Sequence, residues 1–188
     1  MKQLITLAAL VFLGCSNFSC TLAYIIDSGV EQSKILLNRT SIREVLNNPN
    51  VANETKHKLK LTQAAKTFAI SSLGLKPTKN YSTYVEIDRP YLTWVVRAAS
   101  YNSLTPYEWW FPIVGKVPYK GYFKKKKALM TANKFNKTKY DTYVRGVTAY
   151  STLGWFEDPI VSPMLRYNDH DIVEVIIHES VHATVYVD

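Results

Sequence analysis

Two histidines and a glutamate near the end of the chain have the types and spacing of a metal site. His178, Glu179 and His182 form the pattern H-E-x-x-H in a sequence of 188 residues. On an α-helix, residues four apart lie on one face, about one turn from each other. Both imidazoles could therefore bind one Zn²⁺ ion, while the carboxylate of Glu179 accepts a proton from the attacking water. The motif predicts metal-dependent hydrolysis, with Glu179 as the general base.

The residues around the motif leave a second conformation open, because many of them are β-branched and favour strands. They are Ile172, Val173, Val175, Ile176, Ile177, Val181, Val185 and Val187. In a strand, the two histidines would lie on one face but about 13 Å apart, too far to share a metal ion. The helix is favoured because Asp169 or Asp171 can cap its start, and because the apolar segment is longer than a usual strand.

The motif supplies two of the three protein ligands that a catalytic zinc site needs. Asp188 stands six residues after His182, but Val185 occupies the position where a helix-breaking glycine would be required. On a continuing helix, Asp188 would lie about 240° around from His182. Glu157 and Asp158 lie in a predicted turn. We therefore expect a domain that is incomplete at its C-terminus. The alternative to a peptidase is a catalytically incomplete envelope lipoprotein that acts as a binding or structural module.

The N-terminal residues have the composition of an export signal. Lys2 is followed by an apolar stretch over residues 4–13, which is short for a transmembrane helix. Small residues precede Cys15 and Cys20, as at a bacterial lipoprotein processing site. We expect a signal peptide over residues 1–19, one metallopeptidase domain over 20–188, and lipidation of Cys20 or Cys15. A plain cleaved signal or an uncleaved anchor stays open. The expected location is the bacterial cell envelope, lipid-anchored to the membrane or periplasmic.

The chain is basic, and the surplus of positive charge is local. The formal net charge is +8, and residues 116–145 carry ten Lys and Arg against one acidic residue, Asp141. Such a segment could suit nucleic acid or an anionic membrane surface. No nucleic-acid recognition motif accompanies it, so a solvated basic face is favoured and no nucleic-acid partner is expected. The expected partners are a peptide substrate and the membrane, and the sequence does not set an oligomeric state.

Periodicity and turn residues place the motif in a mixed α+β fold. Helices are predicted over residues 24–39, 41–46, 54–72 and 123–135, and over the motif itself. Strands are predicted over residues 84–87, 92–98, 109–114 and 142–147, with loops over 115–121 and 149–163. The expected architecture is a group of N-terminal helices, a small mixed sheet, and a C-terminal helix that carries the metal site.

Several stretches outside the motif resemble a family of predicted bacterial aminopeptidases, which are zinc-dependent, gluzincin-like and often lipid-anchored. They include residues 73–75, 81–84, 89–91, 110–115, 119–123, 140–147 and 149–156, together with residues 178–184. The resemblance covers about Cys20 to Asp188. It implies His178 and His182 as zinc ligands and Glu179 as the general base. Members of the family continue with an Asn-Glu-containing helix, whose glutamate resembles a third ligand.

Overall fold

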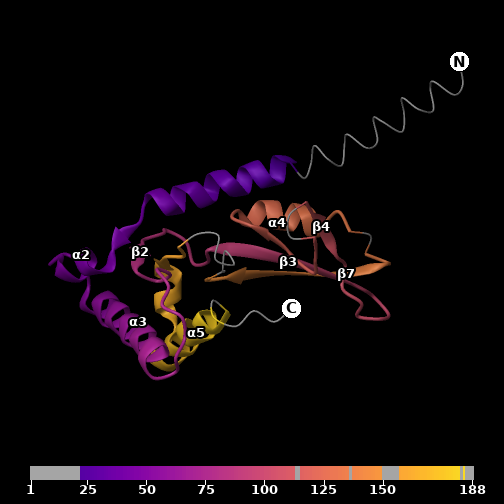
Figure 1. Cartoon of the computed structure of the whole chain (residues 1–188). Helices are drawn as coiled ribbons and strands as arrows, with labels where there is room; N and C mark the ends of the chain where they lie inside the picture. The colour runs from indigo at the N-terminus through magenta and orange to yellow at the C-terminus, as the bar shows by residue number, and fades with distance from the viewer. Residues whose placement is uncertain (1–21, 113–114, 136, 150–156, 183, 185–188) are drawn as a thin grey trace, which may run out of the picture. The chain divides into compact units, whose positions relative to one another are not determined.

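The computed structural model describes residues 22–112, 115–135, 137–149, 157–182 and 184 (Figure 1). It confirms the α+β class, because the chain combines helices with small sheets of two or three strands. The chain forms two compact units. Unit 1 comprises residues 1–35 and 96–144, and unit 2 comprises residues 36–95 and 145–188. The expected signal segment, with Cys15 and Cys20, lies outside the described residues.

Unit 2 is built around two long helices, α3 and α5, which span Asn53–Ser71 and Asp169–His182. Both were predicted from the sequence. The buried face of α3 recurs every three or four residues and comprises Leu59, Thr62, Ala65 and Ala69. After α3, Gly74 adopts a φ of 67°, the left-handed conformation that glycine provides at a helix C-terminus.

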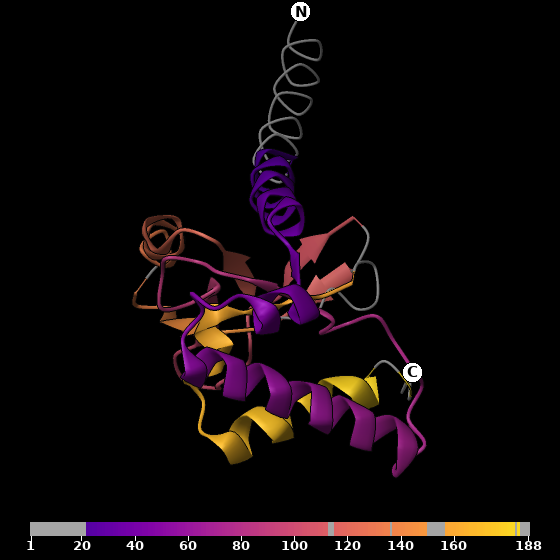
Figure 2. The same cartoon turned by 90° about the vertical axis from the view of Figure 1, so that its left-hand side faces the viewer.

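Helices α3 and α5 pack against each other and run in the same direction (Figure 2). Their starts meet where the Lys58 ammonium donates to Asp169. Beyond their ends, the Lys76 backbone N–H donates to Thr184 Oγ1 at 2.9 Å. Ile172 and Ile176 of α5 are fully buried, so this packing stabilises the motif helix along its apolar side.

The small elements of unit 2 precede and follow these helices. Helix α2 spans Ile42–Asn47 as predicted, but Ser41 makes no side-chain capping hydrogen bond. Strands β1 (Thr40–Ser41), β2 (Thr83–Val85) and β8 (Ile160–Val161) form a sheet in the order β1-β2-β8, where β2 pairs antiparallel with β1 and parallel with β8. The prediction of a loop over residues 149–163 is wrong at its end. There β8 is followed by a 3₁₀ helix, Ser162–Arg166, and Ile160, Val161, Pro163 and Met164 are buried in the core.

A second sheet has the order β6-β3-β7. Its strands are β6 (Lys120–Tyr122), β3 (Thr93–Ser100) and β7 (Tyr140–Val147), and β3 and β7 each pass from one unit into the other. Strand β4 (Trp109–Phe111) pairs antiparallel with β5 (Gly115–Val117). The prediction of a loop over residues 115–121 is therefore wrong, because β5 lies within this range and β6 begins in it. Helix α4 spans Lys125–Ala132 and confirms the short basic helix.

The N-terminal helix of unit 1 covers residues 22–37, as predicted, and its last two residues belong to unit 2. Its burial is the reverse of that expected for an amphipathic helix, since most of its apolar side chains are exposed. Only Ile35 is buried among its larger apolar residues, which are Leu22, Ile25, Ile26, Val30, Ile35, Leu36 and Leu37. Among the described residues, no helix combines the length and the apolar composition needed to span a bilayer.

Candidate metal centre

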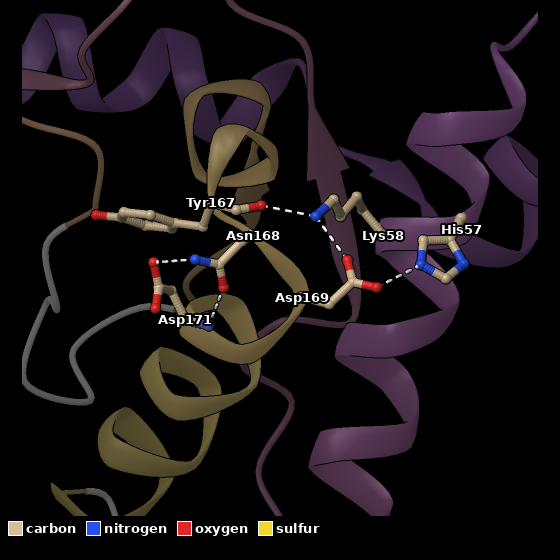
Figure 3. Close-up of polar contacts among 6 residues, drawn as sticks. All are labelled: His57, Lys58, Tyr167, Asn168, Asp169 and Asp171. Atoms are coloured by element: carbon tan, nitrogen blue, oxygen red, sulfur yellow. Dashed lines mark hydrogen bonds and ion pairs between the residues drawn. The ribbon is translucent and has the colours of Figure 1, made fainter.

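The start of the motif helix α5 is capped by a residue that the sequence reasoning missed. Asn168 Oδ1 accepts the backbone N–H of Asp171 at 2.8 Å, and its Nδ2 donates to the Asp171 carboxylate (Figure 3). The expectation that Asp169 or Asp171 caps the helix is therefore wrong. Asparagine is among the best N-cap residues, so the signal was present one position before Asp169.

Asp169 instead joins the two long helices of unit 2. The Lys58 ammonium donates to Asp169 Oδ1 at 2.6 Å and to the Tyr167 carbonyl at 2.7 Å, and His57 Nε2 lies 2.9 Å from Asp169 Oδ2 (Figure 3). Lys58 is only 8 % exposed. Hydrogen bonds from Lys58 and then His57 lower the pKa of the Asp169 carboxyl. These contacts hold the first turn of α5 against α3, about two and a half helical turns before the motif.

The far end of α5 presents the motif residues on two sides. Glu179 stands seven residues after Ile172, so it lies on the side that packs into the protein, and it is half-buried. His178 and His182 are both exposed on the neighbouring side. Ser180 Oγ donates to the Ile176 carbonyl at 2.7 Å, which keeps this hydroxyl on the helix backbone and away from the histidines.

The two histidine rings converge. His178 Nε2 and His182 Nε2 are 3.0 Å apart, and the ring centroids are 4.6 Å apart at an interplanar angle of 82°. Two nitrogen ligands at about 2.0–2.1 Å from a tetrahedral zinc ion lie roughly 3.3–3.4 Å from each other. A small opening of the pair would therefore admit the ion. The helix, rather than the strand alternative, is what the structure has over the motif.

A third donor does not join this pair among the described residues. The group of three metal-ligand side chains found there is His170, Asp171 and Glu174, which lies at the start of α5 and contains neither motif histidine. Glu157 pairs with Lys79 at 3.4 Å. Asp158 is buried. Asp188 lies outside the described residues.

Tyr81 is a buried residue that interacts electrostatically with Glu179, and the sequence reasoning did not single it out. Its side chain is buried, and burial raises the pKa of its phenol, with further increases from the charges of Glu179 and Asp158. Its φ of 60° is unusual for a residue with a side chain. Two bonds hold this backbone, from the Tyr81 N–H to the Asp158 carbonyl at 2.6 Å and from Gln63 Nε2 to the Tyr81 carbonyl at 2.8 Å. A protonated phenol thus stands within electrostatic reach of the Glu179 carboxylate.

Comparison with known proteins adds a family to this geometry. The model of a family described as "Putative aminopeptidase" matches residues 23–188. The chain belongs to this family. No curated protein and no solved structure matches it. Membership in an aminopeptidase family indicates a peptidase function, and the match runs from the N-terminal helix through the motif helix.

Proposed function

We propose that this aminopeptidase-family chain hydrolyses peptide bonds with one zinc ion held by His178 and His182. The observation that carries the proposal is the 3.0 Å separation of the two Nε2 atoms on the exposed side of α5. Exposed, convergent imidazoles leave room for a metal ion and for a substrate beside it. A bound zinc ion would polarise the scissile carbonyl and lower the pKa of the attacking water.

The protein groups beside the histidines support an acid–base role for Glu179. The carboxylate is half-buried on the inward side of α5, and it can take a proton from the attacking water and deliver it to the leaving amine. Tyr81 is protonated at neutral pH, as an ordinary tyrosine is, and burial followed by the charge of Glu179 raises the pKa of its phenol further. It therefore offers a hydrogen-bond donor, and not a second anion, near the reacting groups.

Zinc binding and hydrolysis can be tested separately by substitution. His182→Ala should lower zinc affinity at least tenfold, measured by competition with a chromophoric chelator, because one of two described ligands is lost. Glu179→Gln should retain zinc but lower hydrolysis of aminoacyl or peptide substrates by about 10²–10⁴, the usual contribution of a general base. His170→Ala is the comparison, since His170 is an exposed histidine on the same helix outside the motif; loss of zinc from this variant would assign the ion to His170, Asp171 and Glu174 instead. Full turnover in Glu179→Gln would refute the assigned role.

A second function is favoured by the two-donor site of the described residues. The chain would then be a catalytically incomplete module that binds a peptide or partner in the cell envelope. Cobalt(II) substitution distinguishes the two functions, because a four-coordinate site with three protein ligands and water gives intense visible absorption bands. A weakly bound ion with no such bands would favour the binding module.

We also propose that the protein works in the bacterial cell envelope, where Cys20 or Cys15 would carry a lipid. The apolar stretch over residues 4–13 and the small residues before each cysteine support this location. Metabolic labelling with a fatty-acid analogue, compared between Cys15→Ser and Cys20→Ser, identifies the acylated residue. Absence of label from both variants and from the parent chain would contradict the proposal.

A further inference from the structure

The net positive charge of the protein is carried by unit 1. In the described part of unit 1 there are eleven Lys and Arg against four Asp and Glu. Unit 2 has eleven of each, so its charges balance. The peptidase motif belongs to the neutral unit. The basic unit therefore has an electrostatic property that the proposed hydrolysis does not use.

The N-terminal helix of unit 1 turns its polar side inward. Asp27 pairs with Lys127 of α4 at 2.6 Å, and Glu31 pairs with Lys124 at 3.5 Å. Lys127 lowers the pKa of the Asp27 carboxyl. Lys34, followed by Lys124, lowers the pKa of the Glu31 carboxyl. The acidic groups of the helix are therefore committed to lysines of the same unit.

An aromatic contact fixes the same inward side. Tyr24 packs at 5.6 Å from Phe111 and 5.4 Å from Tyr122, measured between ring centroids, and its hydroxyl donates to the Gly121 carbonyl at 2.8 Å. The Lys120 ammonium lies 4.3 Å from the Tyr24 ring centroid. One face of this helix therefore faces the protein. Along it, Tyr24, Asp27 and Glu31 contact other segments of unit 1, and Ile35 is buried.

The outward side of this helix is apolar. Leu22, Ile25, Ile26 and Val30 are 42–58 % exposed, and with Gly29 they follow the i, i+3, i+4, i+7, i+8 pattern of a continuous stripe. In a water-surrounded protein this stripe would face the core. The polar side of this helix faces the protein and its apolar side is exposed. Such an exposed face is suited to contact with an apolar surface, such as a lipid bilayer.

We infer that unit 1 is a docking surface for an anionic lipid bilayer, with the stripe Leu22–Val30 in the interfacial layer and exposed lysines of the same unit against phospholipid headgroups. Exposed aromatic side chains of the same unit, among them Trp110, Tyr119 and Tyr143, are of the types that sit at membrane–water interfaces. The basic charge complements anionic lipid and disfavours a second copy, because two such surfaces repel each other.

In the sequence, the helix that carries the stripe follows an apolar segment. Eight residues separate the end of the apolar stretch over residues 4–13 from Leu22, where the described part of the helix begins. An interfacial helix immediately after such a segment would lie against the same bilayer. A single acyl chain gives weak, reversible attachment to a membrane. A second, electrostatic contact would make the attachment stable. The inference is independent of whether zinc binds at His178 and His182.

The test is partition of the full chain between buffer and vesicles of phosphatidylcholine alone or with 30 % phosphatidylglycerol, with Cys15→Ser and Cys20→Ser present throughout to prevent acylation. Residues 1–21 are then identical in every protein, so differences report unit 1. We expect binding to the anionic vesicles at least tenfold above the neutral ones, and this excess should vanish in high salt. Equal binding to both compositions would overturn the inference.

Charge variants identify the unit responsible. Lys126, Lys134 and Lys137 are exposed and make no ion pair within the described ranges. Changing these three to Gln should weaken anionic binding about fivefold for each lysine that reaches the headgroups. The matched control removes three positive charges from unit 2, at the exposed side chains Arg43, Lys60 and Lys76. An equal loss in both triple variants would show a general effect of net charge and overturn the assignment.

Apolar variants test the stripe. Ile26→Gln with Val30→Gln should lower binding to both kinds of vesicle about tenfold, because each exposed side chain loses its transfer into the interface. Phe68→Gln with Leu73→Gln, at exposed apolar positions of unit 2, should change neither. Sedimentation velocity supplies the competing outcome. Concentration-dependent dimers that disappear in the Ile26/Val30 variant would assign the stripe to a copy of the chain and overturn the bilayer assignment.

Discussion

Replacing Lys58 with methionine should destabilise unit 2, because it removes a nearly buried ammonium that holds α5 to α3. The side chain is 8 % exposed and donates to the Tyr167 carbonyl at 2.7 Å and to Asp169 at 2.6 Å. Methionine retains most of the apolar stem and removes both hydrogen bonds. The start of the motif helix then loses the lysine's two hydrogen bonds, while the His57–Asp169 pair and the apolar packing through Ile172 and Ile176 remain.

The magnitude follows from the two acceptors. A hydrogen bond from a charged donor contributes about 1.5–3 kcal/mol. The Asp169 side chain is 56 % exposed, so water replaces the lysine there and the main loss is at the Tyr167 carbonyl. Relief from burying the ammonium offsets part of that loss. We expect the free energy of unfolding to fall by about 1–2 kcal/mol.

Urea unfolding followed by far-UV circular dichroism measures this change, with Lys60→Met as the control. Lys60 is exposed on the same helix, so its substitution should change the free energy of unfolding by less than about 0.5 kcal/mol. Hydrogen exchange should also accelerate at the first-turn amides of α5 in Lys58→Met alone. Equal unfolding free energies for the two variants would refute the reasoning, because they would show that the buried ammonium makes no net contribution.

Two further predictions concern unit 2. The pKa of the Asp169 carboxyl is lowered in the folded state. Its stabilising contribution is therefore complete above the unfolded pKa of about 3.9 and is lost as the pH falls through the folded pKa. In urea titrations, the difference in unfolding free energy between wild type and Asp169→Asn should be larger at pH 7 than at pH 3. A Cβ at Gly146 would lie 2.3 Å from Tyr91 Cγ, so Gly146→Ala should displace that ring and cost about 1–3 kcal/mol. Gly121→Ala, where nothing lies within 4 Å, is the control, and a melting temperature shared by the two alanine variants would contradict the predicted clash.

Local sequence signals predicted the longer elements well. The periodic segment before Gly74 became α3, and the alternating segments around residues 92–98 and 142–147 became β3 and β7. In each, the side-chain pattern and the flanking turn residues indicate the same conformation over two or more turns or four or more alternations. The short pairings β5, β6 and β8 have two or three residues each, too few for a pattern to form. Their existence depends on partners distant in the chain.

The candidate site also has one feature that the sequence predicted and one that it did not. The spacing of His178 and His182, together with helix-capping residues upstream, predicted two imidazoles on one helix face, and the structure brings their Nε2 atoms to 3.0 Å. The electrostatic interaction between Tyr81 and Glu179 was not predictable, because the residues are 98 positions apart in the sequence. It arises from the backbone bonds that hold Tyr81 beside Asp158 and Gln63.

The sequence by itself determined the α+β class, the long helices and the pair of histidines one helical turn apart, because periodicity and spacing act within a single element. Tertiary structure alone decided which side of each helix meets the protein. From the sequence, Asp169 was a plausible cap of α5. In the structure its carboxylate accepts a hydrogen bond from Lys58 of α3, and Asn168 caps the helix. The N-terminal helix carries apolar residues on more than one side, and its orientation was set by Lys124 and Lys127, about a hundred residues away, because ion pairs and aromatic packing hold its polar side inward.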